Sequence, residues 1–166
     1  MHPTFIPSSH PLAAVNDSYN AVFLTGDAVE DIMLYGRGAG SLPTASAVVS
    51  DVIFAATHSE IKYSTFKNTA TASPETKFVS NFESAYYVRL SVEDKAGVLA
   101  KIMGIFSKCG ISIVEVAQKG TPEKPDERIP LIVITHKTNE NAMKNAVAKI
   151  NASGITKVES VIRVEK

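Results

Sequence analysis

The stretch YYVRLSVEDKAGVLAKIMGIFSKCGISIVEVA, residues 86–117, decides the fold because its hydrophobic period changes twice. Residues 86–92 place an apolar side chain at every second position, which is typical of a strand with one buried face. Residues 98–106 instead repeat apolar side chains at helical spacing, and Gly110 supplies a C-cap. Residues 111–117 have the pattern of a second strand. The stretch therefore predicts a strand, a helix and a strand in succession.

The sequence that follows predicts the same kinds of element again. Residues 130–136 (PLIVITH) predict a third strand and residues 158–164 a fourth. Between them, Asn139 can cap a helix that ends at Gly154. The order β-α-β-β-α-β over residues 85–166 predicts an α+β, ferredoxin-like fold, in which an antiparallel sheet carries both helices on one face. This fold alone specifies no function, because it serves many.

Composition and charge exclude several classes of protein. The chain has 166 residues, of which 45% are apolar, too many for a disordered tail. Its 17 basic and 17 acidic residues give no net charge, so the total does not suggest nucleic acid or an anionic membrane as a partner. Residues 1–57 carry a net charge of −4, however, and residues 85–166 a net charge of +4. This asymmetry indicates separate modules.

Other residue types narrow the choice further. A single cysteine, Cys109, excludes an intrachain disulfide and a thiolate cluster, and fits the reducing cytoplasm. The four histidines lie at no ligand spacing, so we expect no metal site. The central strands lack aromatic residues for stacking bases, so we expect no nucleic-acid partner. No apolar run is long enough to span a membrane and no secretory leader is present, which predicts a cytoplasmic protein.

The sequence predicts three segments. Residues 59–84 are rich in Ser, Thr, Asn and Lys without a sustained period, which is typical of a linker. Its scattered aromatic residues leave open whether part of it packs against a neighbour. The linker separates a first module, residues 1–58, from the ferredoxin-like module, residues 85–166. Three prolines within the first eleven residues predict that no helix forms there.

The first module contains a glycine-rich loop, GRGAGSLPT at residues 36–44, that leads into a helix of small apolar residues. Backbone amides of such a loop can approach a phosphate or a nicotinamide closely. The loop is not a phosphate-binding P-loop, because no lysine follows, nor the dinucleotide fingerprint, because position 41 is Ser. Glycines that only permit tight helix packing are an equally good interpretation.

The turn at residues 94–97 carries the small-molecule signal of the second module. Gly97 permits close backbone approach, the free N–H groups at the helix start favour a carboxylate, and Asp94 can hold an ammonium group. A zwitterionic amino acid suits such a place. The alternative is that Asp94 is an N-cap and Gly97 a turn glycine, with no ligand involved.

Residues 94–113, DKAGVLAKIMGIFSKCGISI, followed by EVAQ, resemble the ACT domain, a regulatory module that binds amino acids. ACT domains usually open with Asp-x-Pro-Gly-x-Leu; here Ala96 stands where Pro is common and Ser112 where Asn is frequent. The resemblance implies side-by-side pairing into a homo-oligomer, with a small amino-acid effector at the seam. By analogy, the expected effector contacts are Asp94, Ala96, Gly97, Val98 and Leu99, with Ile113 and Gln118 from the facing strand.

Residues 2–29 and 35–51 resemble the last part of the catalytic region of homoserine dehydrogenases. That family reduces aspartate semialdehyde to homoserine with NAD(P)H, on the route to threonine, isoleucine and methionine, and many bacterial members end in an ACT domain. The resemblance implies that the 36–44 loop closes over the nicotinamide end of the cofactor site. Gly40 is the expected cofactor contact, together with Gly38 and Ala39.

The resemblance also implies that the family's catalytic residues have no counterpart in this chain. The dinucleotide fingerprint, the catalytic lysine and the acidic residues that grip homoserine are missing, so we expect a C-terminal fragment of a longer enzyme. Alone it is expected to bind no NAD(P) and to be inactive, with the missing N-terminal catalytic region as its partner and threonine as its effector. The alternative is a free-standing ACT-type regulator whose first 57 residues form a docking arm.

Overall fold

The computed structural model describes residues 2–58, 79–118, 120 and 127–165. The chain divides into two compact units, of which the first contains Met1–Ile6 and Phe78–Lys166 and the second Pro7–Lys77. The predicted linker lies outside the described residues except for its last six, 79–84. The first six residues of the chain thus belong with the C-terminal module rather than with the residues that follow them.

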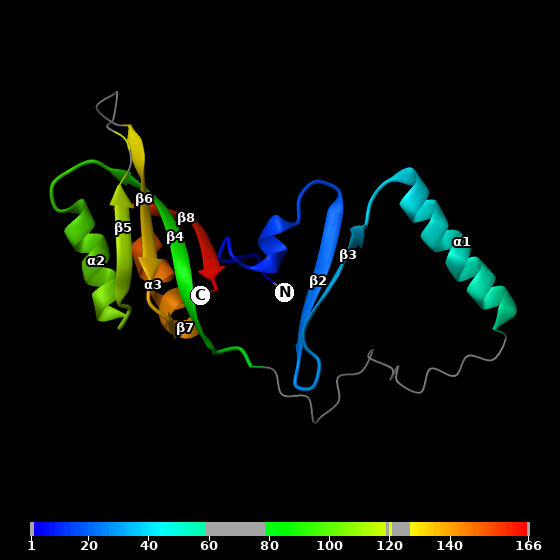
Figure 1. Ribbon diagram of the computed structural model, residues 1–166. Coiled ribbons are helices and arrows are strands. Elements are labelled where there is room, and N and C mark those ends of the chain that lie inside the picture. The colour runs from blue at the N-terminus through cyan, green and yellow to red at the C-terminus, as the bar shows by residue number, and fades with distance from the viewer. Residues whose placement is uncertain (1, 59–78, 119, 121–126, 166) are drawn as a thin grey trace. The chain divides into compact units, whose positions relative to one another are not determined.

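The first unit contains the predicted ferredoxin-like arrangement. Its elements in chain order are β4 (Glu83–Glu93), α2 (Val98–Lys108), β5 (Ile113–Gln118), β6 (Arg128–Thr135), α3 (Glu140–Ala152) and β8 (Lys157–Val164). These strands lie in the order β8-β4-β6-β5, and each neighbouring pair is antiparallel (Figure 1). A two-residue strand, β7 (Thr138–Asn139), pairs with the start of β4. The predicted α+β fold is confirmed.

The core of this unit lies on one face of the sheet. Alternate residues of β4 are buried there, together with Ile102 and Phe106 of α2 and with Ile150 of α3. Both helices therefore cover the same face. Each large side chain in this core contributes roughly 1.5–3 kcal/mol by leaving water. The β4 residues in the core are Tyr86, Val88, Leu90 and Val92.

The helix ends follow from single residues. The Asn139 side chain accepts a hydrogen bond from the Asn141 backbone N–H at 3.0 Å, as an N-cap does, which confirms the predicted start of α3. Gly110 and Gly154 have φ values of 72° and 68° just after α2 and α3. Left-handed backbone of this kind ends helices and favours glycine, so both predicted stops are confirmed.

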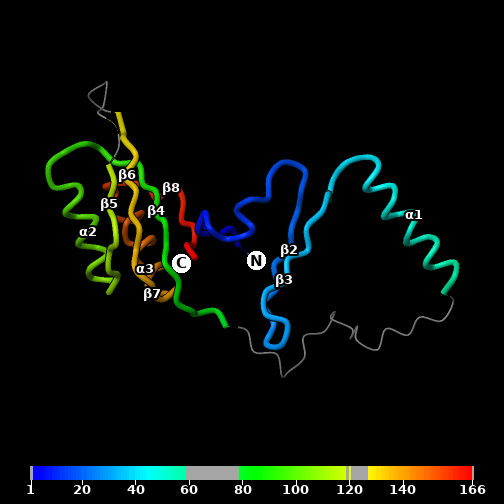
Figure 2. Tube along the Cα trace, in the orientation of Figure 1, coloured from blue at the N-terminus to red at the C-terminus, as the bar shows by residue number. Residues whose placement is uncertain are grey.

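A short strand at the start of the chain extends the sheet. In β1 (Thr4–Phe5), Thr4 is the parallel partner of Arg163 and Phe5 that of Val164, which covers the outer edge of β8 (Figure 2). The Phe5 ring meets the Tyr87 ring edge-on, with centroids 5.2 Å apart. Sequence analysis did not predict this pairing, because two residues show no period.

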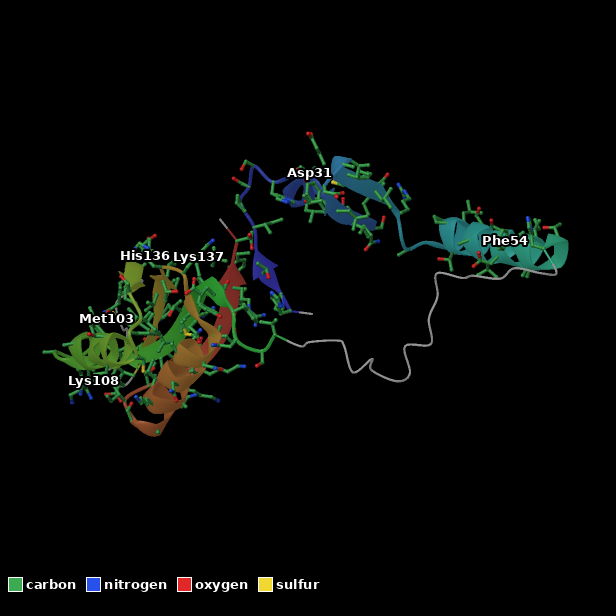
Figure 3. All side chains as sticks on the ribbon, turned by 90° about the horizontal axis from the view of Figure 1, so that it is seen from below. Asp31, Phe54, Met103, Lys108, His136 and Lys137 are labelled. Atoms are coloured by element: carbon green, nitrogen blue, oxygen red, sulfur yellow. The ribbon has the colours of Figure 1, made fainter. Side chains whose placement is uncertain are left out.

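The second unit is a hairpin followed by a helix. Its strands are β2 (Tyr19–Gly26) and β3 (Glu30–Arg37), which pair antiparallel from Tyr19 with Arg37 to Gly26 with Glu30. The helix is α1 (Ser41–Thr57), as predicted after the glycine loop. No residue of β3 or α1 is buried. Asp31 on β3 and Phe54 on α1 are labelled in Figure 3.

The expectation that the N-terminal prolines exclude helical structure is wrong at one place. Residues Pro11–Ala14 form a 3₁₀ turn, η1, whose N-cap His10 accepts a hydrogen bond from the Leu12 N–H at 3.1 Å. Pro11 occupies the first helical position, where a missing N–H costs nothing. The His10 ring packs on Phe23 of β2 at 4.7 Å between centroids, which holds the turn against the hairpin.

Among the described residues, no helix has both the length and the apolar character needed to cross a membrane.

Candidate functional site

The turn before α2 is built around a left-handed glycine. Gly97 is the N-cap of α2, with φ 88° and ψ −12°, and no side chain caps this helix end. A non-glycine residue in this conformation costs roughly 1–2 kcal/mol. A Cβ placed on Gly97 would meet no atom within 4 Å, so open space lies next to the backbone here. The interpretation of Asp94 as an N-cap is therefore wrong.

Asp94 instead contacts the end of β5. The Gln118 side-chain N–H donates to the Asp94 carboxylate at 2.8 Å, and both residues are exposed. This bond joins two predicted effector contacts that lie 24 positions apart in the sequence. The turn and the end of β5 thus form one surface, in which a carboxylate, an amide and the N-terminus of α2 lie together.

Charged side chains brace the same turn. Glu93 pairs with the Lys95 ammonium at 2.8 Å and with the Arg128 guanidinium at 3.6 Å. The hydrogen bond and the charge of Lys95, helped by Arg128, hold the pKa of Glu93 below its usual value. The Lys95 backbone N–H also donates to the Glu93 carbonyl at 3.0 Å. Glu93 therefore faces two cations, whereas the Asp94 carboxylate contacts the Gln118 amide.

The other predicted effector residues lie at different places. Ala96 and Leu99 are exposed beside the turn, whereas Val98 is half-buried and packs on the core. Ile113 begins β5, five residues before Gln118, so it lies about 16 Å from that residue along the strand. It also packs against the core. Within one copy of the chain, the structure brings Asp94, Ala96, Gly97, Leu99 and Gln118 together, and Ile113 lies apart from them.

Strand β5 forms the end of the sheet opposite β8 and β1. Val114 and Val116 on this strand are exposed, as is Leu99 on α2. An apolar edge strand is a template for pairing with another chain. The end of this strand reaches the turn that precedes α2, through the contact of Gln118 with Asp94.

The glycine loop of the second unit has local reasons for its glycines. Gly40 is the N-cap of α1 with φ 119°, outside the range that other residues adopt. A Cβ on Gly38 would overlap the amide nitrogen of Asn20 on β2, because the two would lie 2.2 Å apart. Gly38, Ala39 and Gly40 are all exposed. The loop therefore offers bare backbone at the start of a helix, which fits a flat, anionic cofactor.

A buried charge cluster in the first unit was not predicted. The Tyr86 hydroxyl donates to the Glu140 carboxylate at 2.6 Å, and the Arg163 guanidinium donates to the same oxygen at 3.0 Å. Burial, and then the bond to Glu140, raise the pKa of Tyr86 to about 12. Burial alone would raise the pKa of Glu140, but the hydrogen bonds from Tyr86 and Arg163 outweigh it and lower that pKa.

One signal in the sequence points to this cluster. Glu140 occupies the first turn of α3, where the helix dipole favours a negative charge. Arg163 gives no such signal, because the register shift in the β4–β8 pairing, and not a simple alternation from Val158, places it opposite Tyr86. In the described part of the chain, no group of three His, Cys, Asp or Glu residues lies close enough to hold a metal ion.

Two family models match the chain in succession. Residues 1–53 match the homoserine dehydrogenase model, and residues 86–154 match the ACT domain model. The second match covers the turn at Gly97 and both helices of the first unit. The first match covers β1, the hairpin and most of α1.

Known proteins match the chain from end to end. The homoserine dehydrogenase of Corynebacterium glutamicum is 38% identical over 100% of the chain, and that of Pseudomonas aeruginosa is also 38% identical over 100%. The chain covers 37% and 40% of their lengths. The crystal structure of a homoserine dehydrogenase from Thiobacillus denitrificans is 37% identical, with a TM-score of 0.73 over 99% of the chain and 38% of its own.

The match extends to a more distant structure. A homoserine dehydrogenase from S. aureus is 26% identical, with a TM-score of 0.53 over 98% of this chain and 36% of its own. The chain thus spans about two-fifths of the length of the relatives it matches. From the paired family models and these relatives, the chain belongs to the homoserine dehydrogenase family and corresponds to a C-terminal portion that includes an ACT domain.

Proposed function

We propose that this chain is part of an NAD(P)-dependent, cytoplasmic homoserine dehydrogenase that interconverts L-homoserine and L-aspartate 4-semialdehyde, for threonine, isoleucine and methionine synthesis. Residues 85–166 regulate it by sensing an amino acid. The observation that carries this proposal is the end-to-end match of both modules, in the same order, to homoserine dehydrogenases. The pairing of β1 with β8 favours the enzyme over a free-standing regulator, since a docking arm would not start inside the regulatory sheet.

The glycine loop supplies one wall of the cofactor site. Backbone groups of Gly38, Ala39 and Gly40 would hold the nicotinamide end of NAD(P), because all three residues are exposed. When bound, the cofactor supplies or accepts the hydride. Asn20 fixes the loop by filling the space beside Gly38. The loop positions the cofactor, and groups outside the chain carry out the remaining chemistry.

The chain alone is inactive in this proposal. Catalysis needs a complete, oriented set of groups, and the family's catalytic lysine and homoserine-binding carboxylates have no counterpart here. The apolar side chains exposed on β3 and α1, Leu34 and Val52 among them, fit a surface that the remaining catalytic region covers. Oxidation of NADPH with aspartate semialdehyde by the 166-residue chain would overturn this part.

The effector binds at the turn before α2. The free N–H groups at the start of α2 favour its carboxylate, and the Asp94 carboxylate favours its ammonium group. Threonine is the effector that the family resemblance implies. Side-by-side pairing through β5 brings Ile113 of a second copy toward the same seam, which makes the regulated form a homo-oligomer. The effector acts by binding one quaternary arrangement better than another.

Calorimetry tests the effector site. Threonine, methionine, isoleucine and lysine are titrated separately into the chain and into Asp94→Asn. The asparagine keeps an oxygen that accepts from Gln118 but loses the charge, so threonine should bind roughly tenfold more weakly. Asp51→Asn on α1 is the matched control, since it makes the same change at an exposed position of the other unit. Equal threonine affinity in the chain and Asp94→Asn, or no heat with any amino acid, contradicts the proposal.

A further inference from the structure

A cavity of about 380 Å³ lies on the helix-covered side of the first unit, between α3 and β8. Apolar side chains form most of its wall: Met143, Val147 and Ala148 from α3, and Val161 from β8. Pro3, just before β1, closes one side. Sites for small molecules have this size and this apolar character.

One end of the cavity carries the buried charge cluster. Tyr86, Glu140 and Arg163 all line it, as does Lys144. Glu140 uses one carboxylate oxygen for Tyr86 and Arg163, and the other faces the Lys144 ammonium at 3.4 Å. The Arg163 guanidinium also lies 4.6 Å above the centre of the Phe82 ring. These contacts hold the guanidinium in one place before any ligand arrives.

The cluster leaves one donor unused. The Nε of Arg163 is buried and has no hydrogen-bond partner within the described ranges. A buried donor without a partner costs free energy, and because this atom is closed to solvent, a ligand does not reach it in the arrangement described. The cluster also carries two cationic side chains, Arg163 and Lys144, against one carboxylate. A negatively charged group therefore complements this end in charge.

We propose that this cavity is a second ligand site, which binds a small carboxylic acid with a branched apolar chain. The carboxylate meets Arg163, and the apolar chain lies against Met143, Val147 and Val161. The site does not depend on the effector proposal. It lies beside Tyr86 near the start of β4, whereas Asp94 follows the end of β4, roughly 27 Å farther along that strand.

The cavity lies beside the pairing of β1 with β8, so its ligand can affect that pairing. Arg163 is the Cα partner of Thr4 in the β1–β8 pairing, and Pro3 lies against the cavity. A ligand held there contacts the segment through which the first module enters the regulatory sheet. Binding therefore stabilises the attachment of residues 2–6 to β8.

The test uses the 166-residue chain with leucine, isoleucine and the 2-oxo acid of leucine as probes, each titrated and followed by calorimetry and by amide NMR shifts. Leucinamide, which lacks the carboxylate, and acetate, which lacks the chain, are the control probes. We expect an acid with an apolar chain to bind and both controls to fail. Preference for leucine or for its oxo acid identifies whether the natural source is an amino acid or an oxo acid.

Variants locate the binding. Val161→Phe fills the cavity from a position that is 37% exposed, and Val116→Phe on β5, 38% exposed, is its matched control. Arg163→Lys keeps a positive charge but removes the planar guanidinium that Glu140 and Phe82 hold at this end of the cavity. Val161→Phe and Arg163→Lys should each weaken binding roughly tenfold or more, whereas Val116→Phe and Asp94→Asn should leave it unchanged.

The second site is overturned if no probe binds the chain, or if binding survives unchanged in Val161→Phe and Arg163→Lys. If circular dichroism shows that Val161→Phe is unfolded, Ala148→Phe fills the same cavity from an exposed position on α3. Loss of binding in Asp94→Asn alone would assign the acid to the effector surface instead and would also reject the cavity.

Discussion

The two units bury their apolar residues to very different extents. In the ferredoxin-like unit, Leu90 of β4 is fully buried, as are Ile102 and Phe106 of α2. In the hairpin and helix unit, Leu34 of β3 is 61% exposed, and no residue of α1 is buried. Both regions carry regular apolar patterns. A regular apolar pattern therefore specifies which face of a helix or strand is apolar. Whether that face is buried depends on a second element that packs on it.

One matched pair of substitutions tests this difference in burial most directly. Leu90→Ala should lower the free energy of unfolding by about 2–5 kcal/mol, because it opens a cavity in the core. Leu34→Ala removes the same atoms from an exposed strand and should change it by less than about 0.5 kcal/mol. Urea unfolding followed by circular dichroism measures both. Similar losses for the two variants would mean that the hairpin also belongs to a folded core.

The buried charge cluster gives the next largest effect. Tyr86→Phe removes a hydroxyl that donates to a charged carboxylate and should cost about 1.5–3 kcal/mol at neutral pH. The raised pKa of Tyr86 means that its stabilisation is complete below pH 10.0 and is lost as pH rises to about 12.

Urea unfolding at several pH values checks this sign. The difference between the chain and Tyr86→Phe should shrink above pH 10. Because the pKa of Glu140 is lowered, its contribution should be present at neutral pH and be lost as the solution is acidified through that pKa. A difference that stays constant at alkaline pH would show that Tyr86 acts through packing alone.

The smallest effect concerns the turn before α2. Gly97→Ala should destabilise the chain by about 1–2 kcal/mol, because φ is 88° there. Gly104→Ala in the same helix is the control, since an added Cβ also meets nothing within 4 Å and the backbone is helical. It should be neutral or slightly stabilising. Thermal unfolding separates the two, and equal shifts would contradict the strain assigned to Gly97.

The sequence alone predicted the features that depend on local patterns of residues. Alternation gave the four strands of the ferredoxin-like sheet, and Asn139, Gly110 and Gly154 marked helix ends that the structure confirms. It also identified the residues that the turn before α2 brings together. Their role as effector contacts, and that of Gly38, Ala39 and Gly40 as cofactor contacts, stay predictions.

What it missed depends on contacts between distant residues. The pairing of Thr4 with Arg163 joins the two ends of the chain. A strand of two residues is too short to show a hydrophobic alternation, so the sequence does not predict it. The Tyr86–Glu140–Arg163 cluster draws one residue from each of three elements, and each residue alone has an ordinary local explanation. The open space beside Gly97 depends on the backbone conformation of the turn and its surroundings, which the amino-acid sequence alone does not specify.

Our proposal makes the two units parts of one regulated dehydrogenase. Its most direct test joins this chain to the part of the Corynebacterium glutamicum relative that lies outside the match, and measures NADPH oxidation with aspartate semialdehyde, with and without threonine. We expect the joined protein to oxidise NADPH and the chain alone not to. Threonine should inhibit the joined protein, and Asp94→Asn should weaken that inhibition. A folded joined protein without activity, or with activity that no amino acid changes, would contradict this proposal.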